Sequence, residues 1–337
     1  MQMHCGFPFR GAARESLRAF LRGCGLKYDE AVQYSVCMME QEQIAATGSL
    51  DGNVIKCLAV SPDYQSEGLA ATILTELIME AARNGRHHLF LFTKPENEYL
   101  FGNLGFYPVA KTPDVLLMEN RKNGIEVFVS GLKKPDFFTA GGGAEKTSGA
   151  IVANCNPFTN GHLYLIETAA RQCGALHLFI VSEDKSAFSA EDRYNLVRAG
   201  VSHLPSVYLH HTGPYLVSSV TFPDYFLKDT VSARAVNTVL DLTIFAERFA
   251  LPLGISCRFV GEEPFDPVTR EYNRQMQEFL PRYGIRVTEI PRLETGGLAV
   301  SASRVRKLLK EGNPEAVREL VPPATYTYLK NRGKIKS

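Results

Sequence analysis

The 337-residue sequence has almost no net charge, with 37 basic and 36 acidic side chains. A nearly neutral chain gives no indication that a nucleic-acid backbone or an anionic membrane is its main partner. The sequence also lacks an apolar run near the ~20 residues that a membrane-spanning helix needs. Its start, MQMHCGFPFR, has neither the basic nor the apolar region of a secretory signal. We therefore expect a cytoplasmic protein that binds neither nucleic acid nor membrane.

Paired cysteines are missing as well. The seven cysteines are scattered along the chain, and no two of them form a CxxC pair. An odd number of cysteines at these spacings matches neither a disulfide framework nor a zinc site. We expect reduced thiols and no metal ligands from the protein.

The length and composition indicate two ordinary globular domains. A chain of 337 residues exceeds the usual size of a single core. The glycine-rich stretch 139–149 cannot build a core and favours a flexible connection. We therefore predict a first domain at residues 1–138, a linker at 139–149 and a second domain at 150–337.

The two predicted domains differ in their pattern of elements. The first has a helix near residues 14–22 and strands at 31–39, 43–48 and 54–60, which is typical of a small α+β domain. In the second, strands alternate with helices, which predicts an α/β fold with a Rossmann-like, doubly wound parallel sheet. Ligands of such sheets bind at the carboxyl ends of the strands. The predicted strands of the second domain are 150–154, 176–181, 207–210, 256–260 and 285–290, and its predicted helices are 161–172, a helix opened by Ser189, 235–250, 269–280 and 303–310.

The segment Asn154-Cys-Asn-Pro-Phe-Thr-Asn-Gly-His162 lies between the first strand and the first helix of the second domain. A turn in this position aims backbone N–H groups and the positive end of the helix outward, which suits phosphate. Gly161 would let a ligand approach the backbone closely. His162 could donate a hydrogen bond to a phosphate oxygen, although an isolated histidine at a helix start more often only caps or packs.

A second polar segment, Val300-Ser-Ala-Ser-Arg-Val-Arg306, opens a helix near the end of the chain. Hydroxyl groups at a helix start cap free N–H groups and can also donate to phosphate. Arg306, one turn later, could add a charge-assisted contact. The alternative is a capped surface helix. Lys185 follows the second predicted strand. It could contact a phosphate group, or it could be a solvated loop residue.

The first domain carries the segment Gln65-Ser-Glu-Gly-Leu-Ala70 between a strand and a helix. It resembles the pyrophosphate-binding loop of GNAT acetyltransferases, QxxGxG/A, in which free N–H groups at a helix start hold coenzyme A. Active enzymes of that type often have a tyrosine that protonates the leaving thiolate. This chain has Phe101 at the aligned position. The resemblance therefore implies that the domain holds a pantetheine-like arm rather than transferring acetyl from it.

In the second domain, Thr159-Asn-Gly-His162 resembles the TxGH signature of the nucleotidyltransferase superfamily, and Ser301-Ala-Ser-Arg-Val-Arg306 resembles its later Ser/Thr-rich signature. The pairing of such a domain with a GNAT-like domain is similar to the citrate lyase ligase family over nearly the whole chain. This resemblance implies catalytic roles for Thr159 and His162. It implies that ATP contacts Asn156, Phe158, Gly161, Lys185, Ser301, Ser303 and Arg306, and that Gln65, Gly68 and Ala70 hold a coenzyme A-like arm.

The same resemblance implies a substrate set and a reaction. ATP, with Mg²⁺ bound through its triphosphate, would activate acetate as acetyl-adenylate. The acetyl group would then pass to a phosphoribosyl-dephospho-coenzyme A group on the acyl-carrier subunit of citrate lyase. Two alternatives stay open, namely an adenylyltransferase that makes a nucleotide cofactor and is fused to an acetyltransferase, and a non-catalytic ATP-binding regulator.

Overall fold

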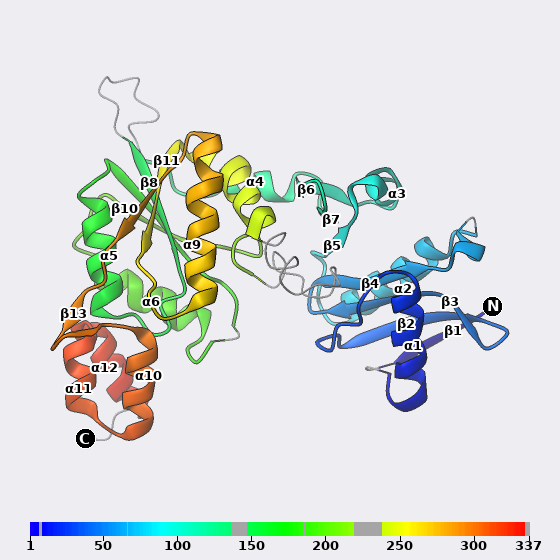
Figure 1. Ribbon diagram of the computed structural model, residues 1–337, viewed down its shortest axis with the longest axis horizontal. Coiled ribbons are helices and arrows are strands. Elements are labelled where there is room, and N and C mark those ends of the chain that lie inside the picture. The colour runs from blue at the N-terminus through cyan, green and yellow to red at the C-terminus, as the bar shows by residue number, and fades with distance from the viewer. Residues whose placement is uncertain (7–8, 66, 136–146, 185, 219–237, 334–337) are drawn as a thin grey trace. The chain divides into compact units, whose positions relative to one another are not determined.

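The computed structural model describes residues 1–6, 9–65, 67–135, 147–184, 186–218 and 238–333. The chain divides into two compact units, which are described here one at a time. Unit 1 contains Met1–Val127, and unit 2 contains Phe128–Ser218 and the described residues from Ile244 onward (Figure 1). None of the helices in the described ranges is long and apolar enough to cross a membrane.

Unit 1 is built on a seven-stranded mixed sheet in the order β1-β2-β3-β4-β5-β7-β6. Its neighbouring strands run antiparallel except for β4 and β5, which are parallel. The strands are β1 (Gln2–Gly6), β2 (Tyr34–Glu40), β3 (Gln43–Asp51), β4 (Val54–Val60), β5 (Phe90–Thr93), β6 (Tyr107–Lys111) and β7 (Leu116–Glu119). The helices are α1 (Gly11–Gly23), η1 (Pro62–Tyr64), α2 (Leu69–Arg83), η2 (Pro95–Asn97), α3 (Glu98–Asn103) and α4 (Gly124–Ser130), and the division between the units falls within α4.

The core of unit 1 forms where α2 packs on the sheet. Leu69, Ile73 and Leu77 recur at helical spacing and are buried. Gly48 on β3 makes this close approach possible, because a Cβ atom there would stand 2.6 Å from the Ile73 side chain. The mixed sheet with one packed helix face confirms the predicted GNAT-like α+β fold.

Unit 2 has a five-stranded, all-parallel sheet in the order β10-β9-β8-β11-β12. The strand order reverses direction between β8 and β11, so the predicted doubly wound, Rossmann-like sheet is confirmed. Its strands are β8 (Ser148–Ala153), β9 (Ala175–Ile180), β10 (Val207–His211), β11 (Ile255–Gly261) and β12 (Arg286–Ile290). The helices between them are α5 (Asn160–Ala170), α6 (Ala190–Gly200), η4 (Phe245–Ala250), α8 (Leu251–Leu253), α9 (Pro267–Phe279) and η5 (Leu280–Tyr283).

Unit 2 ends in elements that extend beyond the last strand of the sheet. A two-stranded hairpin, β13 (Glu294–Thr295) and β14 (Leu298–Ala299), leads into α10 (Ala302–Glu311), α11 (Pro314–Leu320) and α12 (Pro323–Asn331). The sequence analysis predicted α10 but not α11, α12 or the hairpin. The signals for α11 were present, because Asn313 caps it through the Ala316 N–H and Pro314 occupies its first turn.

The predicted linker at 139–149 lies mostly outside the described residues, but its last three residues, 147–149, are described. Ser148 and Gly149 are the first two residues of β8. A Cβ atom on Gly149 would stand 2.5 Å from the Phe259 ring on the neighbouring strand β11. This glycine therefore serves close packing within the sheet rather than flexibility.

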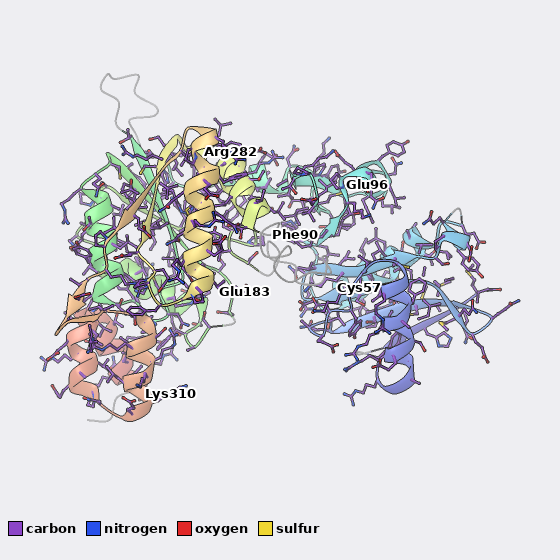
Figure 2. All side chains as sticks on the ribbon, viewed as in Figure 1. Cys57, Phe90, Glu96, Glu183, Arg282 and Lys310 are labelled. Carbon is purple, nitrogen blue, oxygen red and sulfur yellow. The ribbon has the colours of Figure 1, made fainter. Side chains whose placement is uncertain are left out.

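The described cysteines are all free. Cys57 lies on β4 in unit 1 (Figure 2), and burial raises the pKa of its thiol to about 12. Cys155, the second residue of the segment Asn154–His162, is also buried, and its pKa is likewise raised to about 12. A thiol with such a pKa stays protonated at neutral pH, so neither residue is an activated nucleophile.

Candidate active site

A cleft of about 800 Å³ lies at the carboxyl ends of β8, β11 and β12. Four segments line it: the start of α5, the loop between β11 and α9, the end of β12, and the start of α10. The sequence-predicted residues Thr159, Gly161, His162, Ser301 and Ser303 are all among the lining residues. Two segments that lie far apart along the chain thus meet at the place where a doubly wound sheet binds its ligand.

The start of α5 is closed by hydrogen bonds in both directions between Thr159 and His162. The Thr159 hydroxyl oxygen accepts from the His162 backbone N–H at 3.3 Å, and the Thr159 backbone N–H donates to the His162 ring nitrogen Nδ1 at 3.1 Å. Because a backbone N–H can only donate, Nδ1 carries no proton, and the neutral ring keeps its proton on Nε2. His162 is therefore a hydrogen-bond donor through Nε2.

Electrostatics keep His162 in this neutral form. Burial lowers the pKa of the imidazole to about 4, and the positive charge of Arg292 lowers it further in the same direction. At neutral pH the ring is uncharged. It can donate one hydrogen bond to an oxygen in the cleft without carrying a charge of its own.

The start of α10 adds hydroxyl and main-chain donors to the cleft. Ser301 is the N-cap, and its hydroxyl oxygen accepts from the Arg304 N–H at 3.2 Å. The Ser303 hydroxyl oxygen accepts from the Arg306 guanidinium at 3.1 Å. In both residues the oxygen acts as acceptor, so the hydroxyl hydrogen is left to donate. The positive end of the ten-residue helix reinforces this preference for an anion.

Gly161 is the point at which the two segments touch. A Cβ atom at this position would stand 2.6 Å from the backbone oxygen of Val300, immediately before Ser301. We expected this glycine to make room for a ligand. Although Gly161 lines the cleft, the close approach that requires a glycine here is the approach of Val300.

Three residues expected to contact ATP, Asn156, Phe158 and Arg306, contact other parts of the protein and are not among the cleft-lining residues. The Arg306 guanidinium donates to the Asn156 backbone oxygen at 2.5 Å, and the Asn156 side chain accepts from the Phe188 N–H at 3.1 Å. Phe158 is fully buried against α6, where a Cβ atom on Gly200 would meet its ring at 2.3 Å. These side chains support the loop because the ordered turn before α5 needs partners for its backbone. Lys185 lies outside the described residues.

The sequence analysis missed a buried arginine that holds the ends of two strands. Arg193 on α6 is fully buried and donates to the backbone oxygens of Asn154 and Val181 at 3.0 and 2.7 Å. It also donates to the backbone oxygens of Glu183 and Phe188. Burial lowers the pKa of this guanidinium. Arg193 thus joins the segments that follow β8 and β9.

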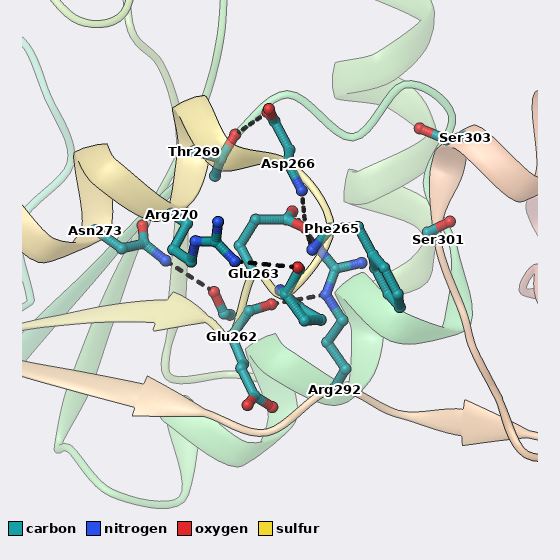
Figure 3. A network of polar contacts seen from close by, with 12 residues as sticks. Glu262, Glu263, Phe265, Asp266, Thr269, Arg270, Asn273, Arg292, Ser301 and Ser303 are labelled. Atoms are coloured by element: carbon teal, nitrogen blue, oxygen red, sulfur yellow. Dashed lines mark hydrogen bonds and ion pairs between the residues drawn. The ribbon is translucent and has the colours of Figure 1, made fainter.

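The loop between β11 and α9 contains the second group that sequence analysis missed. Figure 3 shows Arg292, which follows β12, among Glu262, Glu263, Phe265 and Asp266. The Arg292 Nε donates to the Glu262 backbone oxygen at 2.6 Å, and its Nη2 forms an ion pair with the Glu263 carboxylate. Asp266 caps α9 through the Val268 N–H. The order β11-β12 in the sheet is what brings these residues together, and no local pattern reveals it.

The GNAT-like loop of unit 1 also lies at a helix start. Gly68 is the N-cap of α2 with a φ of 69°, a backbone conformation that favours glycine, and α2 has no side-chain cap. Ala70 lies in the first turn of α2, and Gln65 is exposed before it. Phe101 is buried in the core of unit 1, whereas Tyr99 is 80% exposed. The aligned position therefore holds a core residue with no ionisable group.

Comparison with known families agrees with both units. A profile described as the citrate lyase ligase C-terminal domain matches residues 148–329, and one described as an acetyltransferase (GNAT) domain matches residues 13–115. The chain belongs to the citrate lyase ligase family. The membership inferred from the two motifs is therefore confirmed.

The family includes relatives that match along nearly their whole length. The chain is 42% identical to the citrate (pro-3S)-lyase ligase of Klebsiella pneumoniae, over 94% of this chain and 92% of that protein. It is 41% identical to the protein of the same name from Haemophilus influenzae, over 94% of this chain and 95% of that one. Among solved structures, Thermotoga maritima TmcAL bound with alpha-thio ATP matches 56% of this chain and 57% of its own, at 15% identity and a TM-score of 0.37.

Proposed function

We propose that this chain is an AMP-forming acid–thiol ligase that uses ATP and acetate to acetylate the acyl-carrier subunit of citrate lyase. The names of its full-length relatives support the lyase as the target. The observation that carries the proposal is the meeting of His162 with Ser301 and Ser303 in one cleft at the switch point of the sheet. These residues offer a ring N–H, two hydroxyls and a helix start to an anionic ligand.

The proposed reaction has two steps. In the first, a carboxylate oxygen of acetate forms a bond to the α-phosphorus of ATP, and the bond from that phosphorus to the β-phosphate oxygen breaks, releasing pyrophosphate. In the second, the carrier thiol loses its proton to solvent and its sulfur forms a bond to the carbonyl carbon of acetyl-adenylate. The bond from that carbon to the phosphate oxygen breaks, and AMP leaves. The protein's part is to position the reactants and to place donors where negative charge develops.

Mg²⁺ is part of the same proposal. When bound with ATP, it would neutralise part of the charge of the triphosphate. Within the described ranges there is no group of three or more histidine, cysteine, aspartate or glutamate side chains arranged to hold a metal ion. In this proposal the metal arrives with ATP. We also propose, from the sequence, that the protein is located in the cytoplasm.

Unit 1 is proposed to hold the prosthetic arm of the carrier. The N–H groups at the start of α2 offer a site for the pyrophosphate of a coenzyme A-like group. Beside them, β4 and β5 pair only through Val54 with Phe90 and Ile55 with Leu91, so the later part of β4 has no β5 partner. A buried phenylalanine at the position of the usual acid supports binding of the arm without transfer chemistry in this unit.

The decisive assay is exchange of radioactive pyrophosphate into ATP with acetate present. We expect acetate-dependent exchange by the wild type, and a loss of at least about 100-fold in His162→Ala, because one donor to the transition state is removed. Product analysis with the carrier subunit should yield AMP. A dinucleotide product would instead indicate the adenylyltransferase alternative, and ATP binding without any pyrophosphate release would indicate the regulator.

A further inference from the structure

Arg292 is the single cationic side chain among the described residues that line the cleft. Its side chain is 23% exposed, so it is partly removed from water. The other charged residues of the lining are the carboxylates Glu262, Glu263 and Asp266. A triphosphate bound here needs a cationic partner, because opposite charge is what compensates an anion that leaves water.

The guanidinium of Arg292 is held from two sides. Its Nε donates to the Glu262 backbone oxygen at 2.6 Å, and Nη2 pairs with the Glu263 carboxylate. Its third nitrogen, Nη1, makes no hydrogen bond to any described residue, so the donors on that nitrogen are available to a ligand. A guanidinium held along one edge in this way presents the other edge in a fixed direction.

Glu263 is fixed as firmly as the arginine that it holds. Its side chain is 13% exposed, and its Oε1 accepts from the Phe265 and Asp266 N–H groups at 3.1 Å each. The carboxylate therefore joins the turn before α9 to Arg292, the second residue after β12 (Figure 3). The Glu262 carboxylate, by contrast, points away from the guanidinium in the same view.

His162 and Arg292 face the same space, since both line the cleft and the charge of Arg292 acts on the imidazole. Around His162 the lining offers hydroxyls and N–H groups but no second cation within the described residues. Asp266 is occupied as the cap of α9, with its carboxylate accepting from Val268 N–H and from the Thr269 hydroxyl at 2.6 Å.

We propose that Arg292 binds a phosphate group of ATP through Nη1, opposite His162, and that Glu263 is the positioning residue that aims it. The inference rests on the proposed function for the identity of the ligand. It assigns a cationic role to Arg292, whereas the sequence predicted Arg306 and Lys185 as the cationic contacts. Arg306 is bound to the Asn156 oxygen, and Lys185 lies outside the described residues. A planar guanidinium also suits phosphate oxygens better than a point charge does.

Binding of Mg-ATP to the full-length protein by calorimetry, without acetate, tests the role of Arg292. We expect Arg292→Gln to raise the Kd about 30-fold, which corresponds to the loss of one charge-assisted hydrogen bond. Arg292→Lys should recover part of the affinity. Arg286→Gln, at the amino end of β12 and outside the cleft, is the matched control and should bind like the wild type.

The binding assay separates this inference from the proposed function. If the wild type binds Mg-ATP but never exchanges pyrophosphate with acetate, the proposed function fails, and the Arg292 variants still report on the phosphate contact. A wild-type Kd for Mg-ATP in Arg292→Gln overturns the inference. So does a variant whose only defect is a raised KM for acetate, because the arginine would then bind the carboxylate substrate.

Glu263→Gln tests the positioning role. The glutamine oxygen can still accept from the Phe265 and Asp266 N–H groups, so the turn is retained. The ion pair between residue 263 and Arg292 is lost. We expect kcat for acetate-dependent exchange to fall about tenfold, with the KM for ATP unchanged or lower, because a negative charge near the phosphates is removed while orientation is lost. An unchanged kcat, or a raised KM with the melting temperature of the wild type, would show that Glu263 does not aim the arginine.

Discussion

The starts of α5 and α2, two of the described helices that follow a strand and suit phosphate, are built in different ways. At α5 the first turn is closed by side chains, because Thr159 and His162 each accept a hydrogen bond from the backbone of the other. At α2 the first turn begins with Gly68 and has no side-chain cap. The first arrangement fixes the His162 side chain in one orientation, whereas the second offers main-chain donors alone. The comparison indicates chemistry at α5 and binding at α2.

Substituting one glycine at each helix start gives the sharpest test of this comparison. Gly161→Ala places a methyl group 2.6 Å from the Val300 oxygen, so α5 and α10 must move apart. We expect acetate-dependent pyrophosphate exchange to fall about 100-fold, because the donors of the two helices lose their mutual geometry, and the free energy of unfolding to fall by about 1–3 kcal/mol.

Gly68→Ala is the matched variant in unit 1. Its Cβ would have no atom within 4 Å, so the cost is the positive φ alone, about 1 kcal/mol. Pyrophosphate exchange should stay at the wild-type rate. Equal losses of exchange in the two variants would contradict the distinction between the helix starts.

Thr159→Val tests whether the side chain of the cap matters beyond the motif. The variant keeps the size and shape of threonine but cannot accept from the His162 N–H. We expect exchange to fall about tenfold, as the imidazole loses its fixed orientation. Thr159→Ser, which retains the hydroxyl, should stay within about threefold of the wild type. A wild-type rate of exchange in Thr159→Val would show that the Thr159 hydroxyl is not needed to orient the imidazole for the reaction.

The two units should also respond differently to acid. In unit 2, His177 Nδ1 and His210 Nε2 lie 3.0 Å apart in the core. Burial, together with the positive charge of nearby groups, lowers their pKa values to about 4 and about 3. Since an unfolded histidine titrates near 6.5, the unfolded state binds more protons below that pH, and the stability of unit 2 falls as the pH falls from about 6.5 toward 4.

Hydrogen exchange at pH 7.5 and 5.5 would measure this response. We expect amides of β9 and β10 to lose protection corresponding to a free-energy loss on the order of 1 kcal/mol for each histidine. Amides of β2 and β3 in unit 1 serve as the internal reference. If the protection of the β9 amides is unchanged after correction for the intrinsic exchange rate, His177 and His210 do not resist protonation in the folded state.

The smallest expected effect concerns the carrier arm. Ala70→Asp places a negative charge in the first turn of α2, where it suits the helix but repels a bound pyrophosphate. We expect the KM for the carrier subunit to rise about fourfold, with pyrophosphate exchange unchanged. Thr75→Asp, one turn further along the exposed side of α2, is the control. An unchanged KM for the carrier subunit in Ala70→Asp would show that the start of α2 does not bind the prosthetic arm.

Much of the fold of unit 2 was predictable from the sequence, because it follows from patterns between neighbouring residues. The strand–helix alternation predicted the parallel sheet, and the two polar segments at Asn154–His162 and Val300–Arg306 predicted the helix starts that meet in the cleft. The contact between Gly161 and Val300 was not predictable, since it depends on the packing of α5 against α10. For the same reason Arg306 was assigned to phosphate, and the ion pair of Arg292 with Glu263 was missed.

The hydrogen bond from a backbone N–H to the His162 Nδ1 has a consequence for the kind of catalysis proposed for this site. A ring whose pKa is about 4 exchanges no protons with its substrates across the physiological range. The proposed first step needs no such relay, because acetate attacks as an anion and pyrophosphate departs as one. In the proposed reaction the imidazole acts as a fixed, uncharged hydrogen-bond donor. The lower limb of the pH profile of kcat/KM, which reports the free enzyme, should appear only near pH 4 if it belongs to His162.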